Sequence, residues 1–207
     1  MVNTKSLRLI PSNPKEVNLA VELIYSSGPT AFEYVFQNNK VKARDFLKYA
    51  FMNKGGEFSY ENHHSLYLDE EMIGIGGVFD AKAASRFTFW DGYKILRYYR
   101  LQSLDVIRHG LGIEKIIKLP KSNEIALAHL GIKQDYRGRG LGTQLISELM
   151  KIPKKRGQKF VLDVSEENPR AHALYEKLGF KVTSKSESNL RSNYSYVANH
   201  FRMELVL

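Results

Sequence analysis

The sequence predicts a single domain of the mixed α/β class, with helices flanking one sheet. Three observations indicate this. An apolar run at 125–132 leads through a tight glycine turn into a helical repeat at 141–152. Residues 65–68 and 72–79 read as an antiparallel hairpin around an acidic turn. The apolar run 159–164, typical of a strand inside a sheet, precedes a further helix that an Asn-Pro pair begins.

The composition agrees with one well-packed domain. The chain has 207 residues, of which 43% are hydrophobic and 26% are charged, and a chain of this size can bury one core. No apolar run reaches the ~18 residues of a membrane span, and residues 1–6 lack the apolar core of a secretory signal. Cysteine is absent, which excludes disulfides and thiolate metal sites. We therefore expect a cytoplasmic protein that does not associate with membranes.

The formal net charge of +9 fits several acidic partners: nucleic acid, an anionic membrane surface, an acidic protein or a polyanionic cofactor. Basic residues are scattered, apart from the run at 151–156, which we interpret as a solvated helix end and loop. Because a nucleic-acid site needs clustered basic residues, we expect no nucleic-acid partner.

The N-terminal third predicts a strand and two helical regions. Residues 6–10 form the strand, and an Asn-Pro pair at 13–14 begins a helix that ends near 26–29. The second helical region covers about 30–53, and its aromatic side chains are expected mainly in the core. The return strand at 72–79 carries three glycines, which indicates either a closely packed neighbour or a β-bulge. At the C-terminus, two closing strands are expected at 180–184 and 194–207.

The glycine turn is the most informative stretch. Gly138, Gly140 and Gly142 alternate along it, so the backbone can approach a ligand closely. The helix that follows offers free N–H groups and the positive end of its dipole, and Arg137 and Arg139 add charge. Such a turn suits a phosphate or pyrophosphate, although it could also be a sharp connection or a basic surface loop. The lysine of a P-loop and the spacing of a Rossmann fingerprint are both missing.

The run Arg137-Gly138-Arg139-Gly140-Leu141-Gly142 matches the Arg/Gln-x-x-Gly-x-Gly/Ala signature of the GNAT superfamily of acyl-CoA-dependent N-acyltransferases. Downstream, Asn-Pro-Arg-Ala-His-Ala-Leu-Tyr-Glu-Lys-Leu-Gly-Phe at 168–180 resembles the second signature of that family. The resemblance covers about 124–182. It implies a GNAT fold with a twisted, mostly antiparallel sheet. It also implies transfer of an acetyl or short acyl group from acetyl-CoA to a primary amine, by direct attack in a ternary complex and without a metal.

The resemblance also assigns residues. The main chain of Leu130 and Ile132, beside a bulge in the strand, would pair with the pantetheine arm, which Asn168 would also contact. Tyr175 would protonate the departing sulfur, whereas its helical spacing alone would make it a packed core residue. The pyrophosphate would lie on the N–H groups of the turn, namely Arg137, Gly138, Arg139, Gly140, Leu141, Gly142 and Thr143.

The general base is less obvious. Ala126 and Ala128 occupy the positions where many family members carry it, and alanine cannot accept a proton. His129 is out of phase by one residue, although a bulge could turn it inward, and Glu124 has the right parity but lies further back. A water chain or an already neutral amine could serve instead. The other histidines considered are expected at the surface or at helix caps, and their spacing suggests no metal; these are His63, His64 and His172.

Residues 81–122 depart from the family pattern, in which a short turn joins the third and fourth strands. Helical stretches are expected at 81–89, 93–99 and 101–107, packed on one edge of the sheet. This insertion could be a structural or homodimer surface, or a cap over the acceptor site. Its arginines, at 97, 100 and 108, would suit an acidic acceptor. The acceptor itself could be a small amine or a peptide amine. The alanines before His129 also leave open a CoA-binding sensor or scaffold domain without transferase activity.

Overall fold

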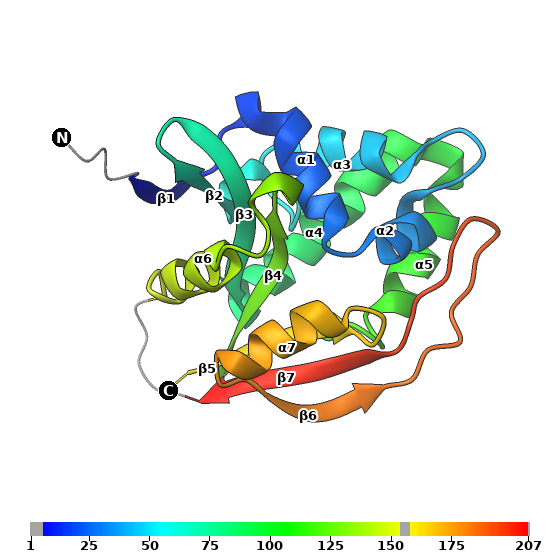
Figure 1. Ribbon diagram of the computed structural model, residues 1–207. Coiled ribbons are helices and arrows are strands. Elements are labelled where there is room, and N and C mark those ends of the chain that lie inside the picture. Colours follow the sequence, from blue (N-terminus) through cyan, green and yellow to red (C-terminus); the bar gives the residue numbers. More distant parts are fainter. Residues whose placement is uncertain (1–5, 154–157, 207) are drawn as a thin grey trace.

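A computed structural model describes residues 6–153 and 158–206, and these residues form one seven-stranded sheet with helices on both faces (Figure 1). The strand order is β1-β2-β3-β4-β5-β7-β6. The strands are β1 (Leu7–Pro11), β2 (His63–Leu68), β3 (Glu71–Asp80), β4 (Glu124–Ile132), β5 (Lys159–Ser165), β6 (Lys181–Ser186) and β7 (His200–Val206). The α-helices are α1 (Val17–Ser26), α2 (Pro29–Phe36), α3 (Ala43–Met52), α4 (Ala81–Tyr99), α5 (Ser103–Ile113), α6 (Leu141–Met150) and α7 (Pro169–Lys177).

The sheet is mostly antiparallel, as predicted, with one parallel pair at its centre. Strands β4 and β5 run parallel and pair over only three positions, from Glu124↔Lys159 to Ala126↔Val161. Beyond Ala126 the two strands separate, although β4 continues to Ile132. A gap therefore opens in the middle of the sheet, where the N–H and C=O groups on that side of β4 have no strand partner.

Two apolar cores cover the two faces of the sheet. Helix α6 packs Leu145, Ile146 and Leu149 on one face, together with the inward residues of β5 and β7. Helices α1 to α5 gather on the other face of the sheet, as Figure 1 shows. Phe46 and Phe51 of α3 belong to the core that they enclose. Because most of the apolar surface is buried in these clusters, they supply the main driving force for folding.

The glycines of β3 coincide with both features that the sequence allowed, closely packed neighbours and a β-bulge. A Cβ at Gly74 would lie 2.7 Å from Ile132 Cδ1, and one at Gly76 would lie 2.6 Å from Leu149 Cδ1, so neighbouring side chains fill this space. The β3–β4 register also shifts between Ile75 and Gly77. The same tight packing occurs at Gly131 of β4, where a Cβ would lie 2.5 Å from the Leu23 carbonyl oxygen.

The insertion differs from its prediction in two ways. Residues 81–99 form the single helix α4, which the Asp80 side chain caps by accepting the Ala83 N–H at 2.9 Å. Helices α4 and α5 pack against α2, α3 and the inner strand β3. The prediction that the insertion packs on one edge of the sheet is therefore wrong. Gly92 does not break α4, since tertiary contacts outweigh the low helix propensity of one glycine.

Smaller differences concern the ends of elements. The helical region at 30–53 divides into α2 and α3, and residues 194–199 precede β7 rather than belong to it. Of the basic run at 151–156, residues 154–156 lie outside the described residues. Within 6–153 and 158–206, no helix is both long and apolar enough to cross a bilayer.

We expect Gly131→Ala to lower the free energy of unfolding by about 1–3 kcal/mol, because the added methyl group meets the backbone of α1. The matched control is Gly92→Ala, where nothing lies within 4 Å of the added Cβ and the helix should gain about 0.5–1 kcal/mol. Urea unfolding of the two variants measures both effects. Equal stabilities would contradict the close approach of α1 to β4.

Candidate functional site

A cavity of about 840 Å³ lies where β4 and β5 separate. One part of it, the turn half, is lined by the glycine turn, by β5 and by α7. The other part, the insertion half, is lined by α2, by Glu57 and Phe58, and by the inner sides of α4 and α5. Residues 126–132 of β4 run between the two halves, so a ligand in either half contacts the same strand.

The glycine turn has the conformation that an anion site needs. Gly138 and Gly140 have φ values of 79° and 77°, in the left-handed region that favours glycine. Gly140 is the N-cap of α6, and no side chain caps this helix, so its first N–H groups remain available. A Cβ at Gly140 would meet nothing within 4 Å, which leaves the approach to the backbone open. The turn therefore fits a diphosphate.

Five of the seven turn residues line the cavity, namely Arg137, Gly138, Gly140, Gly142 and Thr143. Arg137 also donates from Nε to the Ile132 carbonyl oxygen at 2.8 Å, which ties the turn to the end of β4. The structure does not bring the other two to the cavity. Arg139 is exposed beside the Tyr136 ring, and Leu141 is buried in the core under α6.

The two residues predicted on α7 also line the turn half. Asn168 caps the helix by accepting the Ala171 N–H at 3.1 Å. Burial raises the pKa of Tyr175 to about 12. The Tyr175 hydroxyl enters none of the hydrogen bonds found in the described part of the chain, while its ring packs edge-on against Phe180. It is therefore a protonated donor without a protein partner.

Strand β4 contains the predicted bulge, at His129 and Leu130. These two residues lie opposite Gly76, where the register with β3 shifts. His129 has a φ of 53°, unusual for a residue other than glycine. Leu130 and Ile132 line the cavity, and the His129 ring turns into the insertion half, where its side chain is 10% exposed. The ring lies among aromatic side chains, with its centroid 5.1 Å from that of Phe58.

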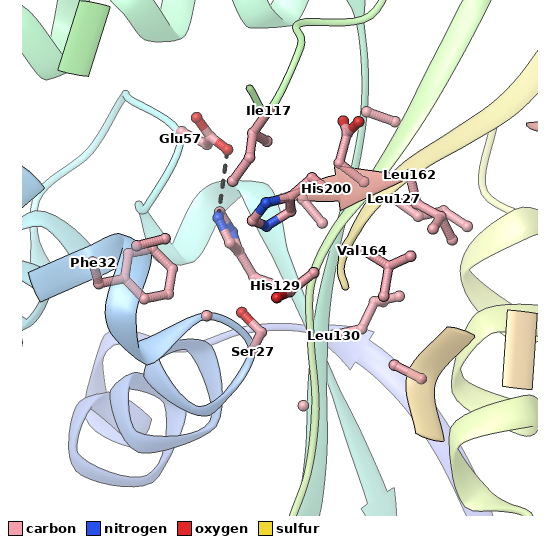
Figure 2. Close-up of a pocket in the computed structure, with 18 of the residues that line it drawn as sticks. Ser27, Phe32, Glu57, Ile117, Leu127, His129, Leu130, Leu162, Val164 and His200 are labelled. Carbon is pink, nitrogen blue, oxygen red and sulfur yellow. Dashed lines mark ion pairs between the residues drawn. The ribbon is translucent and has the colours of Figure 1, made fainter. Parts of the chain in front are cut away.

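Two polar groups contact the His129 ring. Its Nδ1 lies 3.0 Å from Nε2 of His63, and its Nε2 lies 3.4 Å from Oε1 of Glu57. Figure 2 shows the Glu57 carboxyl group facing the imidazole. His63 lies opposite Gly77 of β3, which in turn lies opposite Ala128 of β4. The His63 and His129 rings stack on each other, with their centroids 5.2 Å apart.

The hydrogen bonds fix where the protons lie on both rings. His63 Nδ1 lies 2.9 Å from the Ser59 carbonyl oxygen, which can only accept, so Nδ1 carries the hydrogen. The Nε2 atom of neutral His63 then has a lone pair and accepts from Nδ1 of His129. This arrangement leaves the lone pair of His129 on Nε2, directed toward Glu57 and the cavity.

The pKa shifts favour neutral groups. Burial lowers the pKa of His63 to about 4, and burial together with the neighbouring His63 lowers the pKa of His129 well below its ordinary value. Burial, followed by the charges of Asp91 and Glu114, raises the pKa of Glu57 to about 8. At pH 7 the site therefore holds two neutral imidazoles and a protonated carboxyl group, which can donate to Nε2 of His129.

Glu124 is placed differently. It lies at the start of β4, where its carboxylate accepts from Arg202 at 2.8 Å and from the Lys121 N–H at 2.9 Å. Arg202 also pairs with Asp163 at 2.6 Å. The Glu124 side chain is 3% exposed, and a carboxylate held in this way is a structural partner of Arg202. The structure does not bring Glu124 and His129 together.

His63 is the C-cap residue of the 3-10 helix Tyr60–Asn62, but it does not lie at the surface, since its ring is buried against His129. His64 is half-buried, and His172 pairs with Glu176 at 3.5 Å. No motif or spacing pointed to Glu57, and the His-His pair at 63–64 was the only signal for His63. Among the residues that the structure describes, no three His, Cys, Asp or Glu side chains are grouped to hold a metal ion.

Solved structures share the fold. An N-acetyltransferase from Staphylococcus aureus Mu50 superposes with a TM-score of 0.66 at 15% identity, covering 96% of this chain and 100% of that one. NAA60 of Arabidopsis thaliana, solved in complex with a bisubstrate analogue, superposes with a TM-score of 0.55 at 15% identity, covering 97% and 98%. At these identities, the likeness concerns the fold alone.

Curated relatives align over about a third of this chain. The [Ribosomal protein bS18]-alanine N-acetyltransferase of Escherichia coli K12 is 37% identical over 73 residues, or 35% of this chain. The 5-NmdU N-acetyltransferase of Pseudomonas phage PaMx11 is 35% identical over 66 residues, or 32% of this chain. Each alignment spans 46% of the relative. Residues 33–180 match the family described as Acetyltransferase (GNAT) family, and since this is most of the chain, the protein belongs to that family.

Proposed function

We propose that the protein is an N-acetyltransferase that moves an acetyl or short acyl group from acetyl-CoA to a primary amine in a ternary complex. One observation carries the proposal. A single cavity joins the glycine turn of α6 to the lone pair of a neutral His129 and to the protonated hydroxyl of Tyr175. These are the three groups that acyl transfer from a thioester to an amine needs: an anion seat, a base and an acid.

The turn half is the seat that we propose for acetyl-CoA. The N–H groups at 137–143 would bind the diphosphate, and the unpaired edge of β4 at Leu130 and Ile132 would bind the pantetheine arm. Asn168 would contact the arm from α7, where it lines the same half. Acetyl-CoA, when bound, supplies the acetyl group as a thioester. Holding this group beside the amine supplies much of the rate enhancement.

The proton transfers follow from the positions of the lone pair and the hydroxyl. His129 Nε2 accepts a proton from the amine as the new C–N bond forms. Tyr175 donates its hydroxyl proton to the sulfur as the C–S bond breaks, and it regains a proton from solvent. Because the pKa of Tyr175 is about 12, the hydroxyl is still protonated at neutral pH. We assign no catalytic role to Glu124, which is bound to Arg202.

Calorimetry with acetyl-CoA and an assay of free thiol over a panel of primary amines test the proposal. We expect the wild type to bind acetyl-CoA and release thiol. Tyr175→Phe should bind acetyl-CoA as tightly and lose about a hundredfold in kcat. The control is Tyr194→Phe, which changes an exposed residue outside the cavity. Absence of binding would overturn the proposal, and binding without transfer to any amine would favour the CoA-binding sensor or scaffold domain.

His63 is proposed as a positioning residue that acts through His129. In His63→Phe, His129 loses its Nδ1 acceptor, so both tautomers become accessible and kcat should fall by about tenfold or more. Acetyl-CoA affinity should not change. Nitrogen-15 NMR of the imidazoles should show Nδ1–H on His129 in the wild type and a tautomer mixture in the variant. His172→Phe, outside the cavity, is the control. An unchanged His129 spectrum would exclude the positioning role.

The pH dependence of kcat should show the ionisation of Glu57. Below pH 8 the carboxyl group is protonated and can turn its O–H toward the lone pair of His129 Nε2, 3.4 Å away; above pH 8 the carboxylate cannot donate. Because the pKa is raised, to about 8, kcat should rise with pH through that value at saturating amine. Glu57→Gln, whose amide N–H donates at every pH, should have a low kcat and lack this rise. If the variant keeps the rise, the titrating group is another one.

A further inference from the structure

A second histidine lines the cavity, and no step proposed for acetyl transfer involves it. His200 is the first residue of β7 and lies opposite Ser165 at the end of β5, where the gap beside β4 has opened. Side chains two residues apart on a strand point to the same face. Arg202 donates to the Lys118 carbonyl oxygen at 2.8 Å, so His200 also faces the insertion. Figure 2 shows the rings of His129 and His200 in the same pocket.

The hydrogen bonding of His200 leaves one ring nitrogen free. The residue is 7% exposed, and its Nδ1 lies 2.9 Å from the Ala198 carbonyl oxygen, which can only accept, so Nδ1 carries the hydrogen. Nε2 of the neutral ring then has a lone pair. Within residues 6–153 and 158–206 this atom has no hydrogen-bond partner, and unlike Nδ1 of His64 it is not fully buried. Because the ring lines the cavity, the lone pair is accessible to a ligand there.

The environment of His200 allows it to accept a proton and then to release it. Burial lowers the pKa of His200, so the ring is neutral at pH 7. The Ala198 carbonyl group and the Glu167 carboxylate act in the opposite direction, because both favour an imidazolium. Glu167 is held by the Tyr196 hydroxyl, which donates to it at 2.9 Å. A proton on Nε2 of His200 is therefore balanced by a nearby carboxylate while it is there.

Arg202 and Lys118 oppose a positive charge on His200 only weakly. Arg202 pairs with Glu124 at 2.8 Å and with Asp163 at 2.6 Å, so two carboxylates compensate its charge. Lys118 lines the cavity but is exposed, and solvent screens its charge.

Acetylation of a primary alkylamine needs two protons to leave the nitrogen. Such an amine is an ammonium ion at neutral pH, since alkylammonium groups have pKa values of about 10. It must lose one proton before its nitrogen has a lone pair, and it loses another as the C–N bond forms. The lone pair of His129 is assigned to the second proton. In the part of the chain that the structure describes, His129 and His200 are the two histidines that line the cavity, so a neutral imidazole is also available for the first.

We propose that His200 is a catalytic residue that removes the first proton of the acceptor. An N–H bond of the ammonium ion breaks, the proton binds to Nε2 of His200, and the electron pair stays on the amine nitrogen. The imidazolium then loses this proton to water. The neutral amine attacks the thioester, and His129 takes the second proton. This inference rests on the proposed acetyl transfer and adds a second base to it.

The test uses the full chain, acetyl-CoA and two matched acceptors at pH 7. One is the alkylamine of the panel with the highest kcat/KM, and the other is its O-alkylhydroxylamine, in which an oxygen replaces the CH2 beside the amino group; for ethylamine this is methoxyamine. The two have nearly the same shape, but the alkylamine is an ammonium ion at pH 7 and the hydroxylamine is already neutral. The uncatalysed rate of each is subtracted.

The variant is His200→Asn, which lacks the basic nitrogen but keeps an amide N–H that can donate to the Ala198 carbonyl oxygen. We expect its kcat/KM for the alkylamine to fall by about a hundredfold, while its kcat/KM for the O-alkylhydroxylamine is nearly unchanged. Because each variant rate is divided by the wild-type rate for the same acceptor, differences in nucleophilicity cancel. His172→Asn, outside the cavity, is the control.

The outcomes separate this inference from acetyl transfer itself. Equal losses with both acceptors would mean that His200 has a structural or positioning role, and no loss with either would mean that it has none. Both results overturn the inference and leave acetyl transfer intact. If the wild type binds acetyl-CoA but acetylates no amine, the proposed function fails, and the role of His200 with it.

Discussion

The site depends on one local irregularity, the bulge of β4 at His129. A regular strand would direct the side chain at 129 away from the partners that it has here, as its out-of-phase position predicts. With φ at 53°, His129 adopts a conformation that costs a residue other than glycine about 1–2 kcal/mol. The hydrogen bond to His63 and the contacts with Phe32 and Phe58 offset this cost. Beside the bulge, β4 and β5 no longer pair, which opens the cavity.

The low polarity around His129 determines its chemistry. If Glu57 were ionised and His129 protonated, two charges would be buried side by side, and the desolvation cost of each is large. The neutral pair, with the proton on Glu57, avoids this cost, and the opposite pKa shifts of the two groups express the same preference. A cationic amine entering the cavity changes the balance, because it stabilises the carboxylate and frees the lone pair of His129.

The sequence predicted those parts of the site that are contiguous in the chain. The glycine turn, the helix after it and the Asn168 cap each follow from residues within one turn of each other. The bulge near Leu130 was expected from the family resemblance. His63 was missed because it reaches His129 only through the register of β2, β3 and β4. Glu57 was missed because it lies in the loop before β2, which a contact with Asp91 of α4 holds in place. Parity alone selected Glu124, and parity carries no information about Arg202, which lies 78 positions away in the chain.

The insertion is more than a cover over the cavity, because α4 also fixes the loop that carries Glu57. Asp91 accepts the Glu57 N–H, and Lys94 donates to three carbonyl oxygens at the end of α3 and in the loop. A buried ammonium group is stable only when its donors are satisfied, so these carbonyl groups and α4 hold one another in place. Only a glycine fits at position 56, because a Cβ there would lie 2.1 Å from Asp91 Oδ1. The insertion, which stands where the family resemblance implied a short turn, thus positions the Glu57 carboxyl group that faces the proposed base.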